Sequence, residues 1–392
     1  MVIGLGSMIG AGIFVVFGPA AAAAGSGLLT GLGIAALVAY CNAASSARLA
    51  TLYPLSGGTY VYGRERLGDF WGYLAGWSFV VGKTASCAAM ALTVGVYLWP
   101  GHAHAVAVAS VLALTAVNYR GVQKSALLTR VIVAVVLAVL AGVIAAVALS
   151  GRADPARIAV GGAGAAGVLQ AAGLLFFAFA GYARIATLGE EVRDPARTIP
   201  RAIGVALVMA LGVYVAVAVA VLSALGPQLA HSAAPLADAV RAVGASGLEP
   251  VVRIGAAVAA LGSLLSLILG VSRTGLAMAR DGHLPAALTA IHPRFGVPHR
   301  AEIAVGALVA ALATVADVRA AVGFSSFAVL VYYAIANASA WTLHRSPARR
   351  LIPATGFAGC LLLAVTLPRG SALAGLGVLL LGAAVWAARR LR

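Results

Sequence analysis

Long apolar runs recur along the whole of this 392-residue chain. A helix that crosses a lipid bilayer needs about 20 mostly apolar residues, and runs of this length follow one another here from end to end. Charged residues make up 10% of the chain and the mean hydropathy is +1.01, whereas a soluble domain carries about 25% charged residues. The short alternating segments that are typical of membrane β-barrels are absent from the sequence. The sequence therefore predicts an all-α integral membrane protein.

The apolar runs predict about 12 transmembrane helices in a single polytopic domain that spans residues 1–392. They lie near residues 1–24, 28–49, 69–98, 103–119, 125–149, 167–189, 202–224, 250–279, 301–316, 320–343, 351–367 and 372–389. The loops between them are too short to hold a soluble domain. The longest predicted outer connection, residues 225–249, contains PLADAVRAVGA, for which we expect a short surface helix.

Basic residues are unevenly distributed between the two predicted sides of the membrane. Most of the 27 Lys and Arg residues fall in loops on the side of the N-terminus. The outer loops hold only Arg152, Arg157, Arg241, Arg253, Arg319 and Arg369. Cytoplasmic loops are enriched in Lys and Arg, so we expect a multi-pass protein of the cell membrane with both termini in the cytoplasm. The net charge of +16 reflects this topology and does not indicate a nucleic-acid partner.

Glycines interrupt the first and sixth predicted spans. The first contains GLGSMIGAGIF, and the sixth contains GLLFFAFAGYARIATLGEE with an interruption at Ala180–Gly181. Unpaired backbone is costly in lipid, so such breaks persist where they line a cavity or bind a ligand. Two glycine-interrupted spans five helices apart indicate an inverted-repeat transporter with broken helices. The alternative is close helix packing through the small-residue pair Gly6 and Gly10.

Four motifs, in this order, resemble those of the amino acid–polyamine–organocation (APC) permeases. They are GSMIGAGIF, YPLSGGTYVYGRERLGDFWGYLAGW, FFAFAGYARIATLGEEVRDPARTIPRAI and SRTGLAMARDGHLPAALTAIHPRFGVPHRAE. The resemblance implies a LeuT-type fold with a 5+5 inverted repeat, about residues 1–149 and 167–343, and with broken helices 1 and 6. Two further C-terminal helices at 351–389 would complete it. The resemblance also implies secondary transport of amino acids or related amines by symport or exchange.

The same resemblance implies a substrate site at the two breaks. The substrate α-carboxylate would meet backbone amides of the first break, and the α-amine would meet carbonyls of both breaks. The residues implied are Ser7, Met8, Ile9, Gly10, Ala11, Gly12, Phe177, Ala178 and Ala180. A half-helix that starts near Gly10 would direct its positive dipole end at an anion, which suits this assignment. Phe179 and Tyr182 are candidate gates, although aromatic residues in membrane helices more often serve packing.

The first motif lies close to the N-terminus of the chain. Permeases of the family carry a cytoplasmic tail and a full first half-helix before it, whereas here only MVIGL precedes it. Five residues rise about 7.5 Å, which is far less than half a bilayer. We therefore expect a version of the chain with a longer upstream N-terminus to transport better.

An adjacent carboxylate pair, Glu190 and Glu191, follows the second break. It is a candidate inner gate that pairs with Arg273 or Arg280. The alternative is a solvated helix end balanced by nearby arginines.

Lys83 lies deep inside the third predicted span, about 21 Å along the helix from Asp69. A charge at that depth is costly, and an ionisable residue there indicates function. We therefore take Lys83 as the candidate for proton coupling, with its ammonium in the place that sodium takes in sodium-coupled relatives. Some relatives carry a lysine in the fifth helix, but the corresponding position here, near Val136, is apolar. A proton is preferred to sodium as the coupling ion. The alternative for Lys83 is a static cation that is bonded to backbone carbonyls or faces a wet vestibule.

The substrate expected from the residues is a neutral amino acid, because none of the 11 acidic residues lies at mid-membrane depth. A cationic amino acid or polyamine exchanger of the same fold is the alternative. An intramembrane enzyme or a channel is disfavoured: no catalytic Ser/His, paired Asp or H-E-x-x-H pattern lies within a span, and an open channel needs no occluding break.

No cofactor or metal site is expected either. His102 and His104 offer too few ligands for a metal ion. The three cysteines, Cys41, Cys87 and Cys360, fit neither a zinc site nor a disulfide framework, so we expect them to be small core residues.

Overall fold

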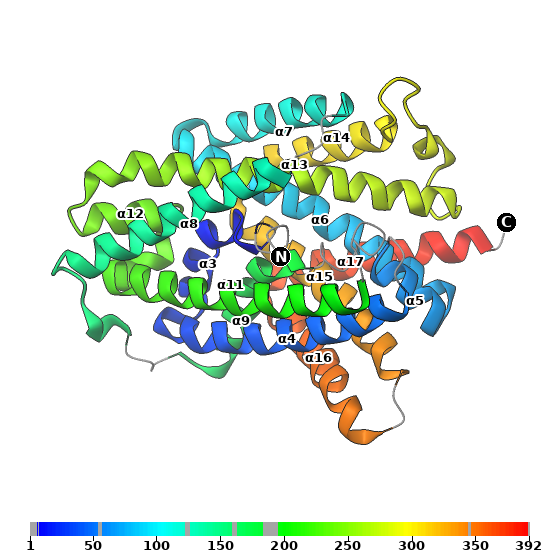
Figure 1. Cartoon of the computed structure of the whole chain (residues 1–392), viewed down its shortest axis with the longest axis horizontal. Coiled ribbons are helices and arrows are strands. Elements are labelled where there is room, and N and C mark those ends of the chain that lie inside the picture. The colour runs from blue at the N-terminus through cyan, green and yellow to red at the C-terminus, as the bar shows by residue number, and fades with distance from the viewer. Residues whose placement is uncertain are drawn as a thin grey trace.

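The structure is a computed structural model, and it describes residue 6 and residues 8–53, 57–121, 126–158, 163–182, 195–343 and 346–390. Every regular element within these residues is a helix (Figure 1). The long helices are α4 (Leu28–Leu52), α6 (Asp69–Leu98), α7 (Ala103–Tyr119), α8 (Ala126–Leu149), α9 (Ala165–Phe179), α11 (Pro195–Leu225), α13 (Glu249–Arg280), α14 (His299–Val315), α15 (Val318–Trp341), α16 (Pro347–Thr366) and α17 (Arg369–Arg390). The short helices used below are α2 (Gly12–Val15), α3 (Phe17–Ala24), α5 (Thr59–Leu67) and α12 (Pro235–Ala242).

The predicted spans agree closely with the helices. The spans at 69–98 and 103–119 coincide with α6 and α7, and the expected short helix in PLADAVRAVGA is α12. In the described part of the chain, nine helices are long and apolar enough to cross a membrane. The all-α membrane class is therefore confirmed, while the twelve crossings and the inverted repeat of the LeuT type stay predictions.

Local residues explain several helix boundaries. Gly25 and Gly68 have φ values of +52° and +101°, which a residue with a Cβ rarely adopts, and they separate α3 from α4 and α5 from α6. The Asp317 side chain caps α15 by accepting a hydrogen bond from the Ala320 amide at 2.7 Å.

The centre of the bundle is formed by α6 and α15. In their most apolar stretches 78% and 72% of residues are buried, against 11% for α7 and 17% for α17. In Figure 1, α12 lies at the left end of the molecule and α5 at the right end, beside the C-terminus. These are called the α12 end and the α5 end below.

A small polar cluster joins α4, α15 and α16 inside the bundle. The Asn337 amide donates to Asn42 Oδ1 at 2.6 Å, and Ser45 Oγ donates to Asn337 Oδ1 at 2.7 Å. The Cys360 thiol also donates to Asn42 Oδ1. All three cysteines are free and buried, which confirms their predicted role as core residues.

Candidate functional site

The first span is interrupted where its glycines predict. Ile9, Gly10 and Ala11 have no helical assignment, and α2 begins at Gly12. The Val16 amide bonds to the Gly12 carbonyl and the Ala20 amide to the Val16 carbonyl, so α2 and α3 continue as one half-helix. Met8, Ile9 and Ala11 are buried. Ser7, which the resemblance places beside them, lies outside the described residues.

The helix at the start of the sixth predicted span ends beside Ala180, and residues 183–194, which follow, lie outside the described residues. We call this helix end the second interruption. Helix α9 ends at Phe179, and Ala180–Tyr182 form a single 3₁₀ turn. The predicted gate residues Glu190 and Glu191 lie outside the described residues, as does the side chain of Tyr182, so their predicted roles stay predictions.

The two interruptions lie against each other. A Cβ atom built on Gly12 would lie 3.0 Å from Ala178 Cα, so the absence of a side chain lets α2 approach α9 closely. Phe177 is buried and also borders Gly12. Gly12 therefore serves close helix packing, although the packing alternative stated from the sequence concerned Gly6 and Gly10.

Gly10 faces a third helix. A Cβ atom on Gly10 would lie 2.3 Å from Ser263 Oγ of α13. The hydroxyl of Ser263 therefore occupies the space that a side chain at position 10 would need. The glycine motif alone did not indicate this neighbour, because the contact depends on how α13 is rotated against the first span.

Tyr214 of α11 connects the two interruptions. Its hydroxyl lies 2.5 Å from the Met8 carbonyl oxygen and 2.8 Å from the Ala178 carbonyl oxygen. A hydroxyl has one hydrogen, so it donates fully to only one of these acceptors at a time. Its ring packs edge-to-face on Phe179, with ring centroids 4.9 Å apart. Tyr214 was not predicted from the sequence; the available signal was one tyrosine hydroxyl within the otherwise apolar run 202–222.

Lys83 reaches the second interruption from α6. Its side chain is 6% exposed, and its Nζ donates to the Ala180 carbonyl oxygen at 3.1 Å. The Ala180 carbonyl is one of those that the resemblance assigns to the substrate amine, so the lysine and a bound amine would share an acceptor. The apolar position near Val136 is also confirmed as buried.

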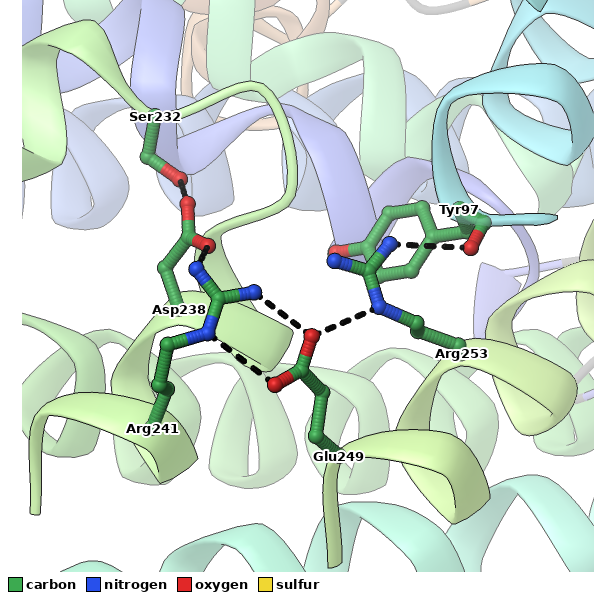
Figure 2. Close-up of polar contacts among 6 residues, drawn as sticks. All are labelled: Tyr97, Ser232, Asp238, Arg241, Glu249 and Arg253. Atoms are coloured by element: carbon green, nitrogen blue, oxygen red, sulfur yellow. Dashed lines mark hydrogen bonds and ion pairs between the residues drawn. The ribbon is translucent and has the colours of Figure 1, made fainter. Parts of the chain in front are cut away.

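The α12 end is closed by a network of charged side chains. Figure 2 shows its members, Tyr97, Ser232, Asp238, Arg241, Glu249 and Arg253. Arg241 contacts both carboxylate oxygens of Glu249, and Arg253 Nε donates to the same carboxylate at 2.8 Å. Arg253 also donates to the Tyr97 carbonyl at 3.0 Å. The Tyr97 hydroxyl donates to the Phe14 carbonyl at 2.7 Å, which ties this end to the half-helix that follows the first interruption.

The α5 end is closed by a different set of groups. Asp281 accepts hydrogen bonds from the Tyr60 hydroxyl at 2.5 Å and from Arg64 Nη1 at 2.9 Å. His283 Nδ1 lies 2.9 Å from the same hydroxyl. Burial lowers the pKa of His283, and the nearby carboxylates of Asp281 and Asp69 oppose this shift. Burial also raises the pKa of Tyr60, and Asp281 adds to the effect.

No group of three or more His, Cys, Asp or Glu side chains that could hold a metal ion occurs among the described residues. The polar groups at the two interruptions are instead backbone carbonyls, the hydroxyls of Tyr214 and Ser263, and one amine. These groups can form hydrogen bonds with a small zwitterion.

Comparison with known proteins gives consistent matches. A family model described as amino acid permease matches residues 1–347. An uncharacterized transporter of Mycobacterium tuberculosis H37Rv is 71% identical over 395 residues, covering 100% of this chain and 90% of that protein. The branched-chain amino acid permease BcaP of Bacillus subtilis is 27% identical over 79% of this chain and 72% of its own length. Human cationic amino acid transporter 4 is 30% identical over 84% of this chain and 56% of its own length.

Proposed function

Since this chain belongs to the amino acid permease family, we propose that it is a secondary active transporter that moves neutral amino acids across the cell membrane by alternating access. The termini face the cytoplasm in this proposal, so the α5 end is the inner end and the α12 end is the outer end. The observation that carries the proposal is the meeting of the two interrupted spans around shared polar atoms, with Tyr214 bonded to the carbonyls of both.

The substrate α-carboxylate binds at the amides of Gly10, Ala11 and Gly12, at the start of the half-helix. The α-amine binds the carbonyls of Met8, Ile9, Phe177, Ala178 and Ala180, with Ser7 beside them. Two of these carbonyls are bonded to Tyr214 in the present conformation and a third to Lys83. An incoming ammonium group therefore takes over acceptors that protein donors hold in this conformation.

The preference for a neutral side chain rests on charge. The Lys83 amine lies at the second interruption, and no described acidic residue bonds to either interruption. A cationic side chain would meet a like charge there with no carboxylate to offset it. A cationic amino acid or polyamine exchanger is the second candidate, because human cationic amino acid transporter 4 is among the relatives. The branched-chain amino acid permease BcaP, also among the relatives, instead favours neutral substrates.

Coupling to protons is assigned to Lys83. Its protonated amine holds the Ala180 carbonyl and so links α6 to the second interruption. Loss of the proton weakens this link, because a neutral amine is a poorer donor than an ammonium group. A proton is therefore preferred to sodium as the coupling ion. Phe179, Tyr182, Glu190 and Glu191 act as gates in this scheme.

A competition experiment in proteoliposomes tests the proposed substrate class. Uptake of a radiolabelled branched or small neutral amino acid is measured in the presence of excess unlabelled leucine, alanine, arginine, lysine or putrescine. We expect the neutral amino acids to compete more strongly than the cationic compounds. Stronger competition by arginine or putrescine would contradict the neutral class and favour the second candidate.

A further inference from the structure

Four buried polar atoms gather between α7 and α14, close to the α5 end, at a distance from the interrupted spans. They are Thr115 Oγ1, His299 Nδ1 and both carboxylate oxygens of Glu302. Among the described residues none of the four has a hydrogen-bond partner. Glu302 is 0% exposed, so water on the protein surface does not solvate its carboxylate.

The contacts between the two helices place these atoms on facing surfaces. A Cβ atom on Gly306 would lie 2.5 Å from Thr115 Oγ1, so this face of α14 packs on α7. Glu302 lies one turn before Gly306 and therefore projects from the same face. Tyr119 lies one turn after Thr115, and its ring centroid is 6.1 Å from that of His299.

Among the described residues, Arg273 of α13 acts electrostatically on Glu302, and its own side chain is exposed. Arg273 and Asn118 line a cavity of about 70 Å³ together with Phe295 and Val297. A cavity of this size holds a few water molecules, and Arg273 belongs both to its lining and to the electrostatic surroundings of Glu302.

Other charged or titratable side chains of the described residues lie on the neighbouring elements. They are Tyr119 at the end of α7, Arg120 directly after it, His292 in the loop before α14, and His299 and Arg300 on α14 itself. The turn Ala286–Thr289 carries none. Helix α6 meets α14 in an apolar cluster that contains Val94 and Val305, and its buried amine, Lys83, is bonded to Ala180.

A carboxylate that is buried without a hydrogen bond or an ion pair is strongly disfavoured, whereas the neutral acid has no such charge to solvate. A metal ion is an unsuitable partner, because no cluster of three or more ligating side chains occurs in the described residues and Arg273 repels cations. We propose that Glu302 is a proton-binding site, distinct from Lys83, which is protonated in this conformation and exchanges its proton with the aqueous phase through the cavity that Arg273 lines.

Exchange of this proton changes the charge between α7, α13 and α14. When the carboxyl group loses its proton to water in the cavity, the carboxylate attracts the Arg273 guanidinium, which is the positive group that already acts on it. When the proton returns, this attraction ends and the arginine returns to solvent. The site thus links the protonation of one carboxyl group to the position of the Arg273 side chain on α13. This proposal does not depend on which solute the protein transports.

Infrared spectroscopy of the purified full-length protein in lipid tests the site directly, because a protonated carboxyl group gives a C=O stretching band that a carboxylate lacks. We expect wild-type protein near neutral pH to show this band and Glu302→Gln to lose it. The matched control is Asp281→Asn, which removes an acid that is partly exposed and bonded to Tyr60 and Arg64, and which should leave the band unchanged.

A second variant covers the case in which Glu302→Gln does not fold. Glu302→Asp keeps the carboxyl group and should keep the band at a shifted position. Absence of the band from wild-type protein near neutral pH, or its persistence unchanged in both Glu302 variants, would overturn the proposal. Since no transport is measured, neither result depends on whether the proposed function is correct.

Discussion

The two interrupted spans differ in the groups that surround them. The first is held by uncharged hydroxyls: Tyr214 at the Met8 carbonyl and Ser263 beside Gly10. The second shares Tyr214 but also carries the Lys83 amine at the Ala180 carbonyl. Only a group that changes charge can couple a proton gradient to movement, so the difference supports a division of roles. In our account the first interruption mainly binds substrate, and the second mainly senses the proton.

The largest expected effect is that of Gly10→Val, which places a side chain inside the first interruption. Its side chain would collide with Ser263, and overpacking costs about 1–3 kcal/mol, so we expect uptake to fall about ten-fold or more. Uptake by purified protein in proteoliposomes measures this. Gly33→Val is the matched control, because a Cβ atom on Gly33 would meet no atom within 4 Å.

A double variant distinguishes packing from substrate binding at the same position. In Gly10→Ala combined with Ser263→Gly, the collision with the serine hydroxyl is removed. We expect uptake to stay impaired, because a methyl group at position 10 still hinders approach to the backbone amides. Full uptake by the double variant would show that Gly10 is needed only for packing.

The next largest effect is expected from Lys83→Met, which removes the charge that distinguishes the second interruption. We expect this variant to equilibrate substrate across the membrane without accumulating it, and to lose the pH dependence of uptake. Cys87→Ala, one turn further along α6, is the control for a change at a buried position. A Lys83→Met variant with wild-type accumulation and pH profile would remove Lys83 from the coupling mechanism.

A smaller effect is expected from Tyr214→Phe, which acts on both interruptions. The change keeps the ring on Phe179 but leaves the Met8 and Ala178 carbonyls without their donor, and a buried unpaired acceptor costs about 1–3 kcal/mol. We expect the melting temperature of the substrate-free protein to fall and added substrate to restore part of it. The control is Tyr97→Phe, which loses a hydrogen bond to Phe14 outside the interruptions. In this control, added substrate should raise the melting temperature no more than it does in wild-type protein.

The smallest effect concerns His283 at the α5 end, away from both interruptions. Burial lowers the pKa of His283 in the folded protein, so the unfolded chain binds a proton more readily. Stability is therefore complete above the ordinary histidine pKa of about 6.5 and declines as the pH falls below it. We expect His283→Gln to reduce the fall of the melting temperature at acid pH. The same substitution at the exposed His231 is the control. An unchanged fall in His283→Gln would contradict the role of His283 in this pH dependence.

Much of the helical arrangement followed from hydropathy and glycine alone. The span at 69–98 was predicted from its apolar run, and α6 has these bounds. The interruption of the first span followed from glycines at 10 and 12. The groups around that interruption did not follow, because Tyr214 and Ser263 lie far away in sequence and reach it only through the packing of α11 and α13.

Glu302 illustrates the same limit for buried charge. The sequence placed none of the 11 acidic residues at mid-membrane depth and did not single out Glu302, whose burial depends on the close contact of α14 with α7 at Gly306. Lys83 could be identified from depth along one helix, but its acceptor, the Ala180 carbonyl, depends on where α9 ends. The depth of a residue along a predicted membrane helix therefore indicates that it is buried, and tertiary packing determines which group it contacts.

Proton-driven accumulation tests the central claim most directly. Proteoliposomes that contain the purified protein are given an inward proton gradient and a radiolabelled neutral amino acid at low external concentration. The account predicts that the internal concentration rises above the external one, that a protonophore abolishes this excess, and that Lys83→Met shows no excess from the start. Uptake that only equilibrates in wild-type protein, or an excess that survives the protonophore, would contradict a proton-coupled carrier.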